Sequence, residues 1–171
     1  MKPIAKKFIS VFKKKVDKLY KDRLIRGYKD PKILEFHEHT FLINVAIYLT
    51  IKEMDREFDE DLSVVPELGG RSPTDFMVLI NDKDLQLCIE HENNKTRILK
   101  NFIKLFNNDK CEERLLICYV YTESKIESEI AEMKKYAKSH PKSNGKVHVL
   151  IAVKSPEKYF TSSKDYKYEY I

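Results

Sequence analysis

The sequence predicts an α/β domain in which helices cover both faces of a mixed central sheet. Two continuous apolar runs, residues 114–121 and 146–153, indicate buried strands. Two further runs, 75–80 and 85–92, are joined by a polar turn and predict an antiparallel hairpin. Segments with apolar residues at helical spacing lie between these strands. Over about residues 32–153 the expected order is helix, three strands, helix, strand, helix and strand, which is a meander followed by a crossover helix.

The composition is that of one ordinary globular domain. The chain has 171 residues, of which 42% are hydrophobic, and its formal net charge is +5. No apolar run approaches the roughly 18 residues of a membrane span. The three cysteines have no metal-like spacing, so we expect reduced, buried thiols in a cytoplasmic protein. The expected segments are a basic amphipathic N-terminal helix (1–30), a core domain (31–155) and an aromatic C-terminal tail (156–171).

Residues 1–29 carry much of the positive charge. Eleven Lys or Arg residues stand against two acids there, a net of +9, which leaves −4 for the rest of the chain. Lys13, Lys14 and Lys15 interrupt any apolar stretch of a secretory signal. The favoured interpretation is a helix docked on the core with a solvated basic face. The alternatives are an arm that contacts phosphates and an interfacial membrane helix. The apolar residues at helical spacing are Ile4, Phe8, Val11, Phe12, Val16 and Leu19.

A second helix is expected from about residue 32 to residue 54. Its expected buried stripe consists of apolar residues at helical spacing, Leu34, Phe41, Val45 and Leu49. Glu38 lies on the same stripe, where a carboxylate is costly unless it has a partner. Glu38 is therefore either an outer position of a functional site or an edge residue whose carboxylate reaches solvent.

Acidic residues occur in the central hairpin, where buried strands are normally apolar. Asp75 opens the run DFMVLI, and the returning run LQLCIEHE ends in Glu90 and Glu92. Glu90 and Glu92 share one face because side chains alternate along a strand, and their Cα atoms are about 6–7 Å apart. Antiparallel pairing of the two runs brings Asp75 beside both. The alternative is that all three are surface charges at frayed strand ends.

Crowded carboxylates of this kind predict a bound cation. They repel one another, and desolvation raises the cost, which a divalent cation offsets. Anionic oxygen ligands suit Mg²⁺ or Mn²⁺ better than Zn²⁺. Glu67 is a further acid just upstream, near the end of a short strand expected at 61–68. Arg71 follows the Gly69-Gly70 pair, which either forms a plain turn or lets Arg71 approach a phosphate.

The segment after the hairpin adds positive charge close to the acidic strand end. Asn94 is expected to cap a helix that begins near Lys95. Four basic residues lie on or beside this helix, where they are suited to hold a polyanion: Lys95, Arg97, Lys100 and Lys104. A further helix is expected at about 124–139. The aromatic residues of the tail, Tyr159, Phe160, Tyr166, Tyr168 and Tyr170, are expected to pack on the core rather than stack on bases.

These acidic motifs resemble the PD-(D/E)XK nuclease superfamily, which has the restriction-endonuclease-like fold. Pro73-Thr74-Asp75 matches the family's strand-borne Asp with one extra residue after the proline. Glu90-His91-Glu92 stands where Asp/Glu-x-Lys is expected, so the usual lysine is absent, although some restriction enzymes have Glu-x-Glu there. Glu67 resembles the acid that often precedes the core motif, and Glu38 the acid on the helix before the first strand. The expected element order agrees with that fold.

The resemblance implies a metal-dependent nuclease that hydrolyses DNA. Asp75 and Glu90 would hold Mg²⁺ or Mn²⁺, and a second ion would be held by Glu67 or Glu92. Glu92 would otherwise orient the attacking water, and this role is favoured because Glu92 shares the face of Glu90. The alternative is that Lys95 replaces the missing lysine from a shifted position. Basic residues expected to contact DNA are Arg71, Lys95, Arg97, Lys100, Lys13, Lys14 and Lys15. Paired cuts would need a homodimer. The alternative is an inactive nucleic-acid-binding or assembly protein that kept the fold after losing the lysine.

Overall fold

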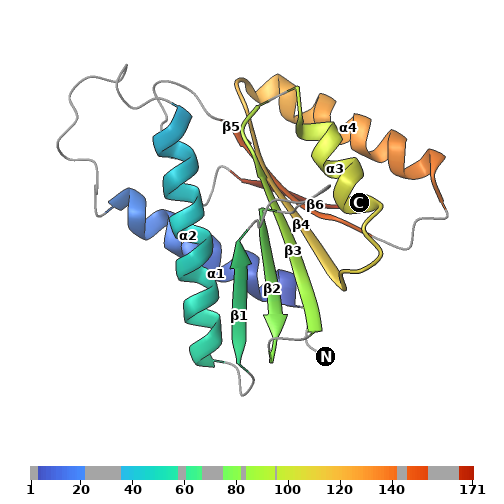
Figure 1. Cartoon of the computed structure of the whole chain (residues 1–171). Helices are drawn as coiled ribbons and strands as arrows, with labels where there is room; N and C mark the ends of the chain where they lie inside the picture. The colour runs from blue at the N-terminus through green and yellow to red at the C-terminus, as the bar shows by residue number, and fades with distance from the viewer. Residues whose placement is uncertain are drawn as a thin grey trace.

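A six-stranded sheet forms the centre of the computed structural model (Figure 1), with its strands in chain order from β1 to β6. The structure describes residues 4–21, 36–57, 61–66, 75–81, 84–94, 96–141, 146–153 and 166–171. Its helices are α1 (Ile4–Lys21), α2 (Phe36–Glu57), α3 (Ile98–Phe106) and α4 (Glu123–Ser139). Its strands are β1 (Leu62–Pro66), β2 (Phe76–Ile80), β3 (Asp84–Glu92), β4 (Glu113–Val120), β5 (His148–Val153) and β6 (Lys167–Tyr170).

The sheet is mixed, and this confirms the expected fold class. Strands β1, β2 and β3 form an antiparallel meander. Helix α3 then connects β3 to β4, and α4 connects β4 to β5, and both of these strand pairs are parallel. The parallel part is buried on both faces, as the continuous apolar runs indicated.

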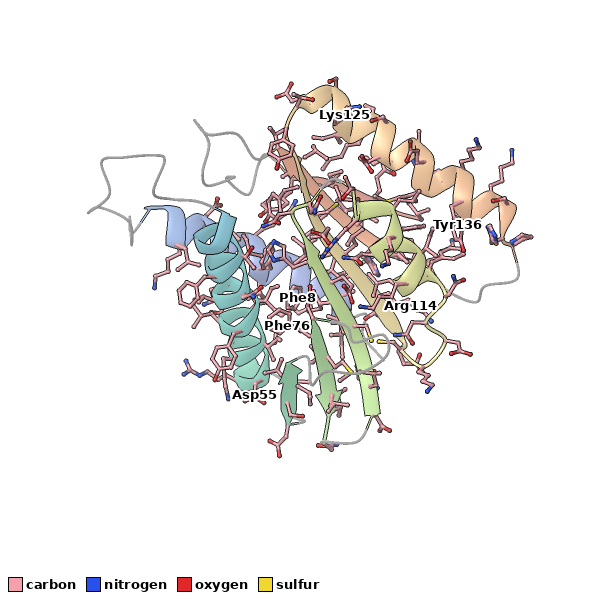
Figure 2. All side chains as sticks on the ribbon, turned by 45° about the horizontal axis from the view of Figure 1, so that its top comes forward. Phe8, Asp55, Phe76, Arg114, Lys125 and Tyr136 are labelled. Carbon is pink, nitrogen blue, oxygen red and sulfur yellow. The ribbon has the colours of Figure 1, made fainter. Side chains whose placement is uncertain are left out.

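The two faces of the sheet are covered by different helices. On β3, Leu87 and Ile89 pack with α1 and α2 in one apolar layer. Cys88, which points to the other face, packs with α3 and α4. Figure 1 shows α1 crossing behind the strands, on the opposite side from α3 and α4. Phe8 of α1 and Phe76 of β2, both labelled in Figure 2, belong to the α1–α2 layer. Side-chain alternation along β3 therefore decides which helix pair each residue meets.

The N-terminal helix α1 is part of the core. Phe8 and Phe12 have no exposed surface, while Lys14 on the opposite side of the helix is exposed. This is the docked helix with a solvated basic face, and the side that would have to enter a lipid surface is buried. No helix in the described residues is long and apolar enough to cross a membrane. The domain boundaries expected near residues 30 and 155 stay predictions.

The expected buried stripe of α2 is wrong. Phe41 is 66% exposed and Leu49 39%, and Val45 is half-buried. Apolar residues occur on more than one side of this helix, so its sequence is compatible with two different buried sides. Packing against α1 and the sheet buries the side that was not predicted. Glu38 lies within α2, but its side chain and Leu34 are outside the described part of the chain. The buried residues are Ile43, Ala46, Ile47, Thr50, Ile51 and Met54.

The end of the chain forms a strand that the sequence pattern did not predict. Residues 167–170 pair antiparallel with β5, and Lys167 aligns with Ile151. Tyr166, just before this strand, is buried against Phe12 and Tyr119. The expectation that the tail packs on the core is therefore confirmed at Tyr166. It is wrong for Tyr168 and Tyr170, which are exposed and lie against the His148 ring at the edge of the sheet. Tyr159 and Phe160 lie outside the described residues. The run KYEY is too short and polar to stand out as a strand.

Polar contacts fix the two helices on the α1–α2 face. The Asp55 carboxylate of α2 (Figure 2) accepts a hydrogen bond from the Leu62 N–H of β1 at 2.8 Å. Glu113 of β4 accepts one from the Ala5 N–H in the first turn of α1, also at 2.8 Å. The other Glu113 oxygen lies 3.5 Å from His148 Nε2. A carboxylate at a helix N-terminus satisfies an otherwise unpaired N–H and complements the helix dipole.

The environment of Glu113 lowers its pKa. Burial alone would raise the pKa, but the contact with His148 and the N–H bonds from Ala5 and Ile4 outweigh it and hold the pKa below the ordinary 4.5. The carboxylate therefore stabilises the fold while it is ionised, and this contribution is lost as the pH falls through the lowered pKa.

Replacing Glu113 should weaken the docking of α1. Glu113→Gln is expected to lower the free energy of unfolding by about 1–2 kcal/mol at pH 7, because a charged hydrogen-bond acceptor is lost. In urea unfolding, the difference from the parent should shrink as the pH falls below 4.5. The exposed neighbour Glu112, changed to Gln, is the control. A parent–variant difference that persists unchanged at pH 3 would contradict the role of the ionised carboxylate.

Candidate active site

Asp75 lies beside the carboxyl end of β3, as the sequence predicted. It is the residue immediately before β2, and its neighbour Phe76 pairs with Ile89 of β3. The Asp75 carboxylate accepts a hydrogen bond from the backbone N–H of His91 at 2.6 Å. Because His91 lies between Glu90 and Glu92, this bond brings the first acid next to the other two.

Glu90 and Glu92 share the α3 face of the sheet. Glu90 Oε1 lies 2.6 Å from Lys104 Nζ of α3, and Glu92 Oε2 accepts a hydrogen bond from Asn101 Nδ2 of α3 at 2.9 Å. Glu90 is 2% exposed and Glu92 9%. Both residues pair in register with β4. The alternative of exposed charges at a frayed strand end is therefore wrong for these two acids.

Glu92 holds the turn between β3 and α3. One carboxylate oxygen accepts the Asn94 N–H at 2.7 Å, and the other is bound by Asn101. The Asn94 side chain in turn accepts hydrogen bonds from the N–H and hydroxyl of Thr96. Asn94 thus supports the approach to the helix but does not cap it, because α3 begins at Ile98, later than expected. Both oxygens of Glu92 have protein partners, which suits a positioning role.

Lys104 is the side chain beside the acids that the sequence placed least well. The sequence places Lys104 only among four basic residues near the strand end. For the missing lysine it favours Glu92, with Lys95 as the alternative because of its closeness in sequence. Helix α3 packs back over β3, so Asn101 and Lys104, three residues apart and therefore on one helix face, both reach the acids. A polar pair at this spacing on the helix just after an acidic strand was the available signal.

The remaining predicted residues fall into three groups. Arg97 and Lys100 are exposed at the start of α3, on the acidic side of the sheet. Lys13, Lys14 and Lys15 are on α1, which covers the opposite face. Lys15 forms an ion pair with Glu53 of α2. The predicted site residues Glu67, Arg71 and Lys95, and the Glu38 side chain, lie outside the described part of the chain.

Two carboxylates at this site have the donor chemistry that a magnesium-type ion prefers. Within the described residues, no three His, Cys, Asp or Glu side chains gather as a ready-made metal site. Magnesium, however, is commonly held by one or two carboxylates, with water and substrate phosphate completing its shell. Asp75 and Glu90 supply that number of hard oxygen ligands, and their donor chemistry matches Mg²⁺ or Mn²⁺.

The opposite face of β3 supports the acidic end. The His91 ring contacts Tyr119 edge-to-face, with ring centroids 5.6 Å apart. The Tyr119 and Tyr166 hydroxyls form a buried hydrogen bond. Asn93 donates a hydrogen bond to the Thr40 hydroxyl of α2 at 2.8 Å. The strand that carries Glu90 and Glu92 is therefore held from both sides, which is the support that a precise site requires.

The Glu90–Lys104 pair should be visible in stability measurements without any substrate. Lys104→Met is expected to lower the free energy of unfolding by about 3 kcal/mol, because it leaves a buried carboxylate without its cation. Adding Glu90→Gln should restore part of that loss, with a coupling energy of about 1–3 kcal/mol. Lys100→Met, at an exposed lysine of the same helix, should change little. The ion pair would be contradicted if the changes in the free energy of unfolding caused by the two single substitutions simply add up in the double variant.

No protein-family model and no curated protein matches the chain. Similar solved structures include the YaeQ protein from Xanthomonas axonopodis pv. citri, with 17% identity and a TM-score of 0.34 over 78% of this chain. They also include SfsA from Pyrococcus furiosus in complex with Ca²⁺, with 14% identity and a TM-score of 0.38 over 74% of this chain. The match covers 62% of the length of each of those chains.

Proposed function

We propose that this protein is a metal-dependent nuclease that hydrolyses phosphodiester bonds of DNA. The supporting observation is the buried carboxylate of Glu90 in β3, which lies 2.6 Å from the Lys104 ammonium and at the same end of the β2–β3 hairpin as Asp75. Burying a charged pair is a weak way to stabilise a fold, since an apolar pair of similar size often serves as well. Buried opposite charges beside a second acid are, in contrast, what phosphoryl chemistry uses.

Each residue has a proposed role. Asp75 and Glu90 hold Mg²⁺ or Mn²⁺, which when bound lowers the pKa of a water ligand and stabilises negative charge on the phosphate. Lys104 has the role of the lysine that is missing from the motif. It either orients the attacking water or stabilises the charged transition state. Glu92 keeps α3 in position through Asn101. Arg97 and Lys100 are exposed on the same side and contact the phosphate backbone.

A second candidate is a nucleic-acid-binding or assembly protein without catalytic activity. The Lys104 ammonium already neutralises Glu90, and both Glu92 oxygens are bound by the turn. Because protein groups already balance the charges of these acids, the site is stable without a metal ion. A homodimer remains a proposal for either function, since paired cuts in a duplex need two sites.

Loss of either proposed metal ligand should abolish cleavage. Asp75→Asn and Glu90→Gln are each expected to reduce Mg²⁺-dependent DNA cleavage by at least about 10²-fold, while DNA affinity measured in EDTA stays near the parent value. Single-turnover rates at saturating enzyme separate the chemical step from binding. Cleavage at the parent rate by either folded variant would refute the site.

A ranking of three further variants distinguishes the proposed roles. Lys104→Met should lose about 10²–10⁴-fold in single-turnover rate. Lys95→Ala should keep the parent rate and show at most weaker, salt-sensitive binding. Glu92→Gln should lose less rate than Lys104→Met, because an amide oxygen can still accept a hydrogen bond in the turn. If the Lys95 or the Glu92 variant is the most damaged, the assignment of Lys104 is wrong.

A further inference from the structure

Helix α1 presents a continuous basic surface to solvent. Five lysines that are exposed or half-buried share one side of the helix, and we call them the lysine face: Lys6, Lys7, Lys13, Lys14 and Lys18. At about 100° per residue they span an arc of roughly 140°. Ser10 and the half-buried Asp17 lie within the same arc, and Asp17 is its one acid. Lys15 points away from this arc, toward Glu53 of α2.

The lysine face is held rigidly. Phe8 and Phe12 on the other side of α1 are fully buried, and Glu113 binds the first turn of the helix. The ion pair between Lys15 and Glu53 joins α1 to α2. Along the axis of this fixed helix, Lys14 therefore lies about 10 Å from Lys7, and Lys18 lies about 6 Å from Lys14. A duplex carries one phosphate charge per about 1.7 Å of its axis, so several phosphates can meet this array at once.

The lysine face and the acidic site lie on opposite faces of the sheet. Helix α1 packs on the side of Leu87 and Ile89. Glu90 and Glu92 contact α3 on the other side. The lysines of α1 consequently do not serve as phosphate ligands for the acids of the same molecule. They form a separate surface that does not contribute side chains to the acidic site.

We propose that the lysine face is a second nucleic-acid-binding surface, which holds the phosphate backbone of duplex DNA without sequence preference. Charge complementarity favours a polyanion. An anionic membrane is disfavoured, because interfacial helices insert an apolar side and that of α1 is buried in the core. Single strands are disfavoured because their binding relies on stacking, and Phe8 and Phe12 are buried.

The test uses the full chain in EDTA, so it does not depend on cleavage. The probe is a fluorescent 20-base-pair DNA duplex, titrated at several salt concentrations. The variant Lys6→Gln/Lys14→Gln/Lys18→Gln should reduce affinity at low salt by about 10-fold or more, and should flatten the slope of log affinity against log salt by up to about 3 units. The matched control, Lys125→Gln/Lys135→Gln/Lys138→Gln, removes the same charge from exposed positions on α4.

Three results would overturn the proposal. Parent-like affinity and slope in the α1 variant would leave the lysines as a solvated surface. Equal losses of duplex affinity in the α1 and α4 variants would show that binding depends only on the net charge of the protein. Binding to vesicles of anionic phospholipid that is lost in the α1 variant, with duplex binding retained, would assign the face to a membrane. Because the titration is done in EDTA, it measures binding without cleavage, so failure of the proposed nuclease activity would leave this result standing.

Discussion

The contact between Glu90 and Lys104 sets the strongest constraint on this structure. A carboxylate that is 2% exposed requires a cation nearby, and Lys104 supplies it at 2.6 Å. For Lys104 to reach Glu90, α3 must turn back over β3 directly after the strand. Glu92 and Asn101 make that turn possible, since the carboxylate binds both the turn backbone and the helix. The acidic residues of β3 therefore help to position Lys104.

The sheet separates two electrostatic surfaces. On the α3 side, the acids end a strand that is paired on both edges, by β2 and by β4. On the α1 side, lysines line a helix whose apolar residues belong to the core. Glu113 links the two sides of the sheet. It is the first residue of β4, which pairs with the acidic strand β3, and its carboxylate accepts a hydrogen bond from the first turn of α1. Under the two proposals made above, nucleic acid held by α1 would reach Asp75 and Glu90 around the edge of the sheet or in a second copy of the chain.

Strand periodicity made most of the fold and part of the site predictable. Alternation placed Glu90 and Glu92 on one face, and the hairpin placed Asp75 beside them, because both depend only on local geometry. The exposed side of α2 was assigned wrongly, since Phe41 suits a buried stripe equally well and only tertiary packing decides. The contact of Lys104 with Glu90 was not predicted, because it depends on how α3 lies across the sheet. Strand β6 was missed because tertiary pairing with β5 outweighs its weak local pattern.

The most direct test of the account is whether Asp75 and Glu90 bind a divalent cation. Calorimetric titration of the parent protein with Mn²⁺, in the absence of DNA, should show a saturable site that is lost in Glu90→Gln and strongly weakened in Asp75→Asn. The exposed Asp109→Asn variant should keep the parent heat of binding. Equal Mn²⁺ binding by the parent and Glu90→Gln, or no binding by the folded parent at millimolar Mn²⁺, would contradict the central claim.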